Sequence, residues 1–417
     1  MLSARKAIAC LALAVCSALP FSQAFAAAKY HIGIITGTVN QGEDEVRGAE
    51  AMIKEYGDVK NGGMIQHLTY PNNFSAEQET TISQIVSLAN DPLMKAIVMN
   101  QAVPGATEGF RRVRQMRPDI LLLGGVPQED PLVIGKVADL IMRNDFVSAG
   151  YRVIWAAKQL GSKTFVHISF PRHMSIETLT RRRMIFEQAC KDLGVKFVFE
   201  TAPDPLSDVG VVGAQQFLLE NVPKWIKKYG KDTTFYATND AHTEPLIRQV
   251  VEHGGFFVEA SLPSPLLGYP GALGIDLKAE QGDFQAIMKK IETAVVAKGG
   301  KGRLGTWSYS FPYSGTVGLT QHAINVIEGK SKMTDLRDIF KAFGKYSPGA
   351  KWGGSYYVDA STGVSEAACE TDDAPEGVTG AAVGSRAPRF RRGALRRLSM
   401  RMSAHKGHCT RPRCFWL

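Results

Sequence analysis

The chain has 417 residues, of which 44% are hydrophobic and 21% are charged, so it is long enough to bury more than one core. Its net charge of +9 does not indicate a nucleic-acid partner, because residues 370–417 hold ten Lys and Arg against four Asp and Glu. Without this tail and the basic pair at residues 5–6, the body carries only +1. The composition therefore excludes a basic, nucleic-acid-binding body.

Residues 1–26 have the pattern of a secretory signal peptide. A basic pair precedes an apolar run over residues 7–19, and Ala-Phe-Ala at residues 24–26 supplies a small-x-small cleavage site. Lipidation at Cys16 is the alternative, although Val rather than a small residue precedes that cysteine. We predict an exported mature chain, periplasmic or otherwise secreted, that begins near Ala27.

Short apolar runs then alternate with amphipathic stretches up to residue 145. The runs are HIGIIT, MIQHLTY, KAIVMN, DILLLGG and VADLIMRND, and FSAEQETTISQIVSLANDP is one of the helical stretches between them. Strands and helices in this rhythm predict a parallel sheet with helices on both faces. We assign this segment to a first lobe.

The pattern starts again after residue 145. Strand-like TFVHISF, VKFVFET, TTFYAT and FFVEASL alternate with helical stretches and predict a second lobe over residues 146–267. Beyond it, a helix, strand-like GTWSYSF, another helix and SYYVDA predict a return to the first lobe.

The predicted fold class is α/β, with two doubly wound parallel-sheet lobes joined by a multi-strand hinge. The first lobe takes residues 27–145 plus about 268–365, with part of the return shared with the hinge, and the crossings lie near residues 145, 265 and 305. Residues 370–417 lack apolar periodicity and are predicted to be a disordered basic tail.

The usual motifs of catalysis and cofactor binding are missing from the sequence. There is no G-x-S-x-G elbow, no H-E-x-x-H helix and no pair of C-x-x-C motifs, and the G-x-G-x-x-G at residues 300–305 follows a helix where a dinucleotide site needs a strand. Cys190 is the one cysteine of the body and fits a buried helix position. We predict no cofactor and no metal ligand.

Candidate ligand contacts follow the strands, because ligands of open parallel sheets bind at the carboxyl ends of the strands. Arg172 there could hold carboxylate, phosphate or sugar oxygens, whereas Arg181-Arg182-Arg183 fits a solvated helix face. One of Asn239 and Asp240 is expected to cap the next helix while the other faces the cleft. The predicted ligand-binding residues are Thr36, Thr38, Asn40, Asn100, Gln101, Asn144, Ser169, Phe170, Arg172, Asn239 and Asp240.

From about residue 29 to 365 the chain resembles the type I periplasmic-binding-protein superfamily, which includes solute receptors and the sensor domains of lactose-repressor-like regulators. HIGIITG and FYATNDAHTEPLIRQVVEHGG carry the resemblance, which is strongest to a functionally uncharacterised bacterial group. It implies that Asp240 and Arg172 contact ligand. The loop TGTVNQGEDEVRGA lacks the aromatic pair of sugar receptors, which puts a sugar ligand in doubt.

The predicted function is therefore an extracytoplasmic solute-binding protein that closes around a small polar ligand and presents it to a membrane transporter or receptor. We expect a monomer and no enzymatic activity. Three alternatives remain open at this point. They are the sensor domain of a regulatory system, an exported hydrolase that pairs His173 with Asp240, and a surface protein without a small ligand.

Overall fold

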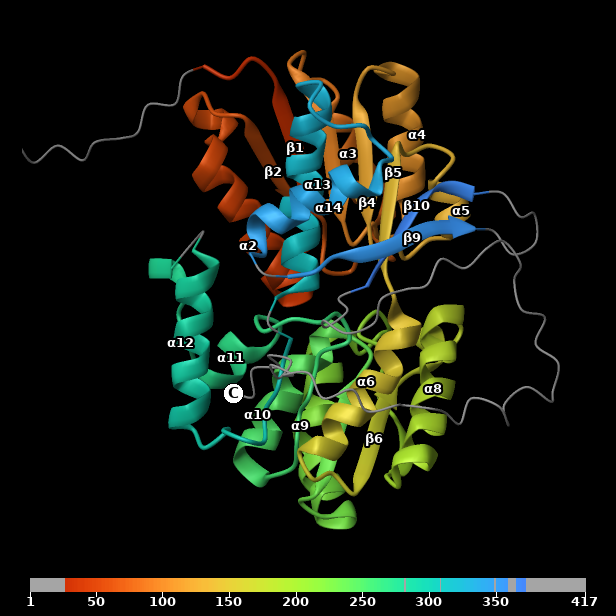
Figure 1. Ribbon diagram of the computed structural model, residues 1–417, viewed down its shortest axis with the longest axis vertical. Coiled ribbons are helices and arrows are strands. Elements are labelled where there is room, and N and C mark those ends of the chain that lie inside the picture. Colours follow the sequence, from red (N-terminus) through yellow and green to blue (C-terminus); the bar gives the residue numbers. More distant parts are fainter. Residues whose placement is uncertain (1–26, 281–282, 308, 349, 359–364, 373–417) are drawn as a thin grey trace, which may run out of the picture.

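The computed structural model describes residues 27–280, 283–307, 309–348, 350–358 and 365–372. The predicted signal peptide and nearly all of the predicted tail lie outside the described residues. The described chain forms two α/β lobes, one above the other in Figure 1, and the predicted fold class is confirmed.

The first lobe is built on a seven-stranded sheet in the order β2-β1-β3-β4-β5-β10-β9, in which only the β9–β10 pair is antiparallel. All five strands expected before residue 145 are present. The strands are β1 (His31–Thr36), β2 (Ile65–Thr69), β3 (Met94–Asn100), β4 (Leu121–Gly125), β5 (Leu140–Asn144), β9 (Gly353–Val358) and β10 (Ser365–Asp372). Its helices are α2 (Val39–Tyr56), η1 (Val59–Asn61), α3 (Gln78–Leu88), α4 (Ala106–Met116), α5 (Pro131–Ile134), α13 (Phe311–Ile327) and α14 (Leu336–Tyr346).

Helices cover both faces of this sheet. Ile32 and Ile34 belong to the core cluster that includes Met52 of α2, whereas Ile35 belongs to the cluster on the other face with Phe110 of α4. Successive side chains of a strand point to opposite faces. A strand that is buried on both faces is therefore apolar throughout, which explains the unbroken HIGIIT run.

The second lobe has a smaller parallel sheet in the order β7-β6-β8. Its strands are β6 (Thr164–Ser169), β7 (Lys196–Thr201) and β8 (Thr233–Ala237). Its helices are α6 (Phe146–Gln159), α7 (Pro171–Met174), α8 (Glu177–Leu193), α9 (Gly210–Tyr229), η2 (Asp240–His242), α10 (Thr243–His253), α11 (Tyr269–Leu273), η3 (Lys278–Glu280) and α12 (Phe284–Ala297). Helices α11 and α12 pack next to α10 on this lobe (Figure 1), although the sequence interpretation began the return to the first lobe at residue 268.

The lobes are joined by segments that run side by side. The chain enters the second lobe between β5 and α6 and leaves it just before α13. Residues 257–264 lie along this exit, where Gly305 N donates to Phe257 O (2.8 Å) and Phe311 N donates to Pro263 O (2.8 Å). The connection is therefore a hinge of several segments held by backbone hydrogen bonds.

Two strands expected near the hinge are absent from the described residues. FFVEASL and GTWSYSF form only isolated bridges. The cause is Glu259, whose carboxylate accepts backbone N–H groups of Ala260 (2.7 Å), Ser264 (3.1 Å) and Trp307 (2.9 Å). Because these N–H groups bond to a side chain, they do not form a ladder with a neighbouring strand.

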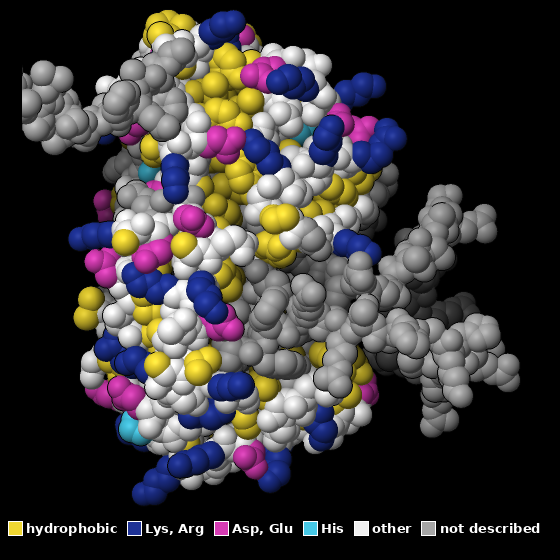
Figure 2. All heavy atoms as spheres, turned by 60° about the vertical axis from the view of Figure 1, so that its left-hand side comes forward, with side chains coloured by type: hydrophobic (Ala, Val, Ile, Leu, Met, Phe, Trp, Pro, Cys, Tyr) yellow, Lys and Arg dark blue, Asp and Glu magenta, His cyan; other side chains and the backbone are white. Residues whose placement is uncertain are grey.

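Charged side chains of both signs lie interspersed over the face shown in Figure 2. This face offers no extended basic stripe of the kind that follows a nucleic-acid backbone. Within the part of the chain that is described, no helix is both long and apolar enough to cross a membrane.

Candidate functional site

The carboxyl ends of strands from both lobes meet at one place. Gln101 directly follows β3, and its Nε2 donates to Oδ2 of Asp240 (3.2 Å), which lies just beyond β8. The same amide donates to Glu45 Oε1 (3.0 Å) and to Gln41 O (3.3 Å) on α2. An amide with two N–H bonds thus serves three acceptors and links the two lobes.

The backbone of Gln101 is in the left-handed region, with φ of 54°. A non-glycine residue there carries backbone strain, and such strain is often found at functional sites. This conformation aims the amide at the lobe boundary.

Asn239 and Asp240 have different roles. Asn239 Oδ1 accepts Ala241 N (2.9 Å) and so caps η2, which leaves the Asp240 carboxylate at the lobe boundary. Burial raises the pKa of Asp240 to about 7, although the nearby Gln101 amide and the Arg182 guanidinium act in the opposite direction. The Asp240 carboxyl is thus poised to change charge near neutral pH.

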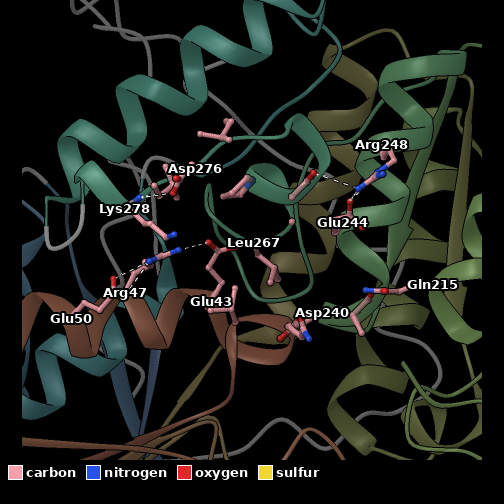
Figure 3. Close-up of a pocket in the computed structure, with 18 residues that line it drawn as sticks. Glu43, Arg47, Glu50, Gln215, Asp240, Glu244, Arg248, Leu267, Asp276 and Lys278 are labelled. Atoms are coloured by element: carbon pink, nitrogen blue, oxygen red, sulfur yellow. Dashed lines mark hydrogen bonds and ion pairs between the residues drawn. The ribbon is translucent and has the colours of Figure 1, made fainter. Parts of the chain in front are cut away.

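Beside Asp240 lies a cavity of about 870 Å³ with walls from both lobes (Figure 3). Arg47 on α2 pairs with Glu43 (3.2 Å) and Glu50 (3.0 Å), and Arg248 pairs with Glu244 on α10. The full lining consists of Val39, Asn40, Glu43, Arg47, Glu50, Gln215, Asp240, Ala241, Glu244, Arg248, Leu267, Gly268, Pro270, Gly271, Ile275, Asp276, Leu277 and Lys278.

Three consecutive acidic residues of α2, Glu43, Asp44 and Glu45, are buried at this boundary. Ser264 and Ser310 of the hinge both donate to Asp44 Oδ1. Burial is the main cause that raises the pKa of Glu43 and of Asp44 to about 7 and that of Glu45 well above its usual range. Sequence reasoning missed these residues, although the charged run directly after the β1 loop was a usable signal.

Among the predicted contacts that follow β1, Asn40 lines the cavity. Thr36 is fully buried and its Oγ1 donates to Gly37 O (2.8 Å), while Thr38 Oγ1 donates to the Asn72 side chain. Thr36 and Thr38 thus have partners within the first lobe. Their role in ligand binding stays a prediction.

The two predicted asparagines at strand ends are buried and differ in their bonding. Asn100 Nδ2 donates to Pro312 O (2.7 Å) and so fastens α13 to the sheet. A methyl group on Gly125 would lie 1.9 Å from Asn100 Oδ1, which shows how tightly this amide is enclosed. Asn144 is 5% exposed, and no described residue forms a hydrogen bond with its Oδ1.

In the second lobe, Ser169 and Phe170 are enclosed at the end of β6. Ser169 Oγ lies 2.7 Å from Thr238 Oγ1, and Phe170 packs 4.2 Å from the ring of His173. His173 Nδ1 also lies 3.1 Å from Thr238 Oγ1, and burial lowers the pKa of His173 to about 3. The hydrogen-bond partner of the His173 ring in the structure is thus Thr238, and a pairing of His173 with Asp240 stays a prediction.

Arg172 forms a bidentate ion pair with Asp204, at 2.6 and 2.8 Å. Asp204 also accepts the N–H of Leu206 (2.9 Å), and Leu206 packs against the first-lobe cluster that contains Phe110. The pair therefore fixes a second-lobe loop that touches the first lobe. Its guanidinium is occupied, and ligand binding by Arg172 stays a prediction.

The expectation that Arg181-Arg182-Arg183 forms a solvated face is wrong for Arg182, which is 1% exposed. Arg182 donates to Ser261 O (3.1 Å) and Oγ (2.9 Å) and lies 4.8 Å from the centre of the Phe146 ring. It therefore ties α8 to two hinge segments. The buried Leu179, Phe186 and Ala189 lie at helical spacing from Arg182, so the periodicity of α8 was a usable signal that this arginine faces inward.

Family comparison places this site within a recognised group. A model of the family described as "Protein of unknown function (DUF3798)" matches residues 30–305, and a second family model matches residues 316–369. The chain belongs to the DUF3798 family. The DUF3798 match runs from β1 to the end of the hinge and so includes every predicted ligand residue.

Relatives of this DUF3798 protein include two proteins from Treponema pallidum (strain Nichols), both called uncharacterized protein. One is 42% identical over 220 residues, which are 53% of this chain and 100% of the relative. The other is 43% identical over 178 residues, which are 42% of this chain and 80% of the relative.

Solved structures confirm the predicted resemblance at the level of fold. A candidate transcriptional regulator from Clostridium difficile 630 aligns with 83% of this chain and 98% of its own, with a TM-score of 0.64 and 21% identity. An ABC sugar transporter subunit from Rhodobacter sphaeroides 2.4.1 aligns with 74% of this chain and 95% of its own, with a TM-score of 0.45 and 15% identity. The two-lobed α/β fold of this DUF3798 protein is thus shared with the Clostridium difficile structure.

Metal binding has no support in the described ranges, where no group of three or more His, Cys, Asp and Glu side chains is arranged to hold an ion. The arrangement instead offers carboxylates and amides of two lobes around one cavity. Such a site can hold a polar molecule by hydrogen bonds and by charge. Its shape changes when the lobes move relative to each other.

Proposed function

We propose that this DUF3798 protein is an extracytoplasmic solute-binding protein whose lobes close around a small polar ligand in the cavity beside Asp240. The observation that carries the proposal is that α2 of the first lobe and η2–α10 of the second lobe both line this cavity. A ligand between them touches both lobes only when they are closed. It therefore favours closure by the difference between its binding free energies in the closed and open states.

The contact between Gln101 and Asp240 supports Asp240 as the central ligand residue. Because three acceptors compete for the two N–H bonds of this amide, a ligand donor can replace one of the bonds without leaving a buried acceptor unpaired. Among the other predicted contacts, Asn40 also lines the cavity. No covalent step is required.

Delivery to a membrane transporter or receptor is part of the proposal and rests on the signal-peptide pattern of residues 1–26. The similarity in fold to the candidate transcriptional regulator favours a second function, a sensor domain of a regulatory system. Amino-terminal sequencing of the protein from the native cell envelope separates the two. A mature chain that starts near Ala27 supports export, and an uncleaved cytoplasmic chain contradicts it.

Native mass spectrometry of the purified mature protein, followed by a thermal-shift screen of metabolites, tests ligand binding. We expect a bound small molecule or a rise in Tm that disappears in Asp240→Asn. The exposed Asp208 undergoes the same chemical change in Asp208→Asn and should keep the full rise. A ligand-induced shift that survives in Asp240→Asn would show that binding occurs elsewhere.

A further inference from the structure

The charge at the lobe boundary is unbalanced. Four carboxyl groups, those of Glu43, Asp44, Glu45 and Asp240, gather where α2 meets η2, and the first three are buried. Asp44, Glu45 and Asp240 accept hydrogen bonds from neutral serine and glutamine side chains. Buried carboxylates normally have a cationic partner.

Among the described residues, four cations lie at this boundary or line its cavity. Arg248 and Lys278 are matched in number by Glu244 and Asp276 of the same lining, and the other two cations are engaged elsewhere. Arg47 bonds to Glu43 and Glu50, and both of these carboxylates line the cavity with it. Arg182 lies close enough to lower the pKa of Asp240, but its hydrogen bonds go to Ser261. Arg182 is therefore near the Asp240 carboxyl without a hydrogen bond to it. When Asp44, Glu45 and Asp240 are ionised, the negative charge of their three carboxyls exceeds the positive charge of this one guanidinium.

A second observation marks the place of a missing donor. Asp44 is 1% exposed, and its Oδ2 has no hydrogen-bond partner among the described residues. Its carboxyl belongs to the cluster electrostatically, because the negative charge of Asp240 adds to the effect of burial on its pKa. A buried carboxylate oxygen without a donor destabilises the closed state unless a ligand or a proton satisfies it.

We propose that the ligand of this cleft is an organic cation, a molecule whose ammonium group is held between Asp240 of the second lobe and Glu43 of α2. Both residues line the cavity, and the buried Asp44 and Glu45 follow Glu43 on the same helix. This inference rests on the proposed function and specifies its ligand. An ammonium group carries the positive charge and the several N–H donors that these carboxylates lack. A cavity of about 870 Å³ accommodates an organic molecule rather than a bare ion.

The site would exchange protons for the cation. With pKa values of about 7, Glu43, Asp44 and Asp240 are largely protonated in acid and ionised above neutral pH. An ammonium ion binds the ionised carboxyls, so its affinity should rise with pH by about tenfold per unit below pH 7 for each carboxyl that must ionise.

A thermal-shift comparison of charge-matched compounds tests the ligand class. The probes are 1,4-diaminobutane, 1,4-butanediol and succinate, each with a four-carbon chain, together with larger amines, polyols and carboxylates of matched size. We expect amines to raise Tm in the wild type and in Asp208→Asn, and to lose this effect in Asp240→Asn. Titration calorimetry of the best amine in two buffers of different ionisation enthalpy should show net proton release near pH 7.

The outcomes separate the inference from the function. Neutral or anionic compounds that raise Tm only when Asp240 is intact would overturn the cationic class and keep the solute-binding function. A panel in which no compound gives a shift that depends on Asp240 overturns both. Affinity for the amine that stays constant from pH 5.5 to pH 7.5 would contradict the role of the buried carboxyls.

Discussion

Replacing Asp44 by Asn should make the protein more stable relative to the wild type as the pH rises. Asp44 is 1% exposed, and burial raises its pKa to about 7, whereas an Asp in the unfolded chain has a pKa of about 3.9. Between these values the folded protein keeps a proton that the unfolded chain has lost. The stabilising contribution of this group is therefore complete below about pH 4 and is lost as the pH rises to about 7.

The size of this effect follows from the shift. One pKa unit corresponds to about 1.4 kcal/mol, so a shift of about three units changes the free energy of unfolding by about 4 kcal/mol between pH 4 and pH 7. Asn has nearly the same shape, can still accept hydrogen bonds from Ser264 and Ser310, and does not ionise.

Urea unfolding followed by tryptophan fluorescence at pH 4.5, 5.5, 6.5 and 7.5 gives the free energies. The buried His67 and His173, whose pKa values are lowered by burial, destabilise the folded state in acid and so oppose the effect of Asp44 in the wild-type profile. They cancel when Asp44→Asn is compared with the wild type. The control Asp208→Asn should differ from the wild type by a few tenths of a kcal/mol at every pH. A constant difference for Asp44→Asn across this range would refute a buried, proton-binding Asp44.

Four further substitutions test the packing of the protein. Gly125→Ala should lower the free energy of unfolding in urea by about 2 kcal/mol, because its methyl group would collide with the buried amide of Asn100. Gly344→Ala in α14 should raise this free energy by up to about 1 kcal/mol, because no described atom beyond the helix itself lies within 4 Å of the new methyl group and Ala favours a helix over Gly. Arg182→Ala should destabilise by about 3 kcal/mol, since it removes a large buried side chain and leaves Ser261 O without its donor, and a change below about 0.5 kcal/mol would contradict this role. Arg172→Ala should lose about 1 kcal/mol of stability with its half-exposed ion pair. If Arg172 also contacts the ligand as predicted, the ligand-induced shift in Tm should fall in this variant, and an unchanged shift would contradict that contact.

The sequence was sufficient for the parts of the fold that depend on local pattern. The five strands before residue 145 and the first three of the second lobe were predicted, because a strand buried on both faces must be apolar along its length. The resemblance of the Asn239-Asp240 segment to sugar receptors also directed attention to this edge of the second-lobe sheet. The structure places Asp240 on the cavity there.

The remaining features depend on contacts between distant segments. Glu259 turns an apolar run into a hinge by binding backbone N–H groups, and no period in the sequence reports this. Asp44 can be buried because Ser264 and Ser310, more than 200 residues away, donate hydrogen bonds to it at the hinge. Arg182 likewise finds its acceptor 79 residues further along the chain. Such long-range pairings decide which charged side chains are enclosed.

The three backbone bonds to Glu259 also constrain how the lobes can move. Ala260 and Ser264 lie on the segment beside the exit from the second lobe and Trp307 lies on the exit itself, so a single carboxylate clips these two segments together. The two segments should then move together, because separating them would leave the buried Glu259 carboxylate without hydrogen-bond donors. The dihedral changes of any opening motion are then concentrated in the crossing between β5 and α6 and in the exit just before α13.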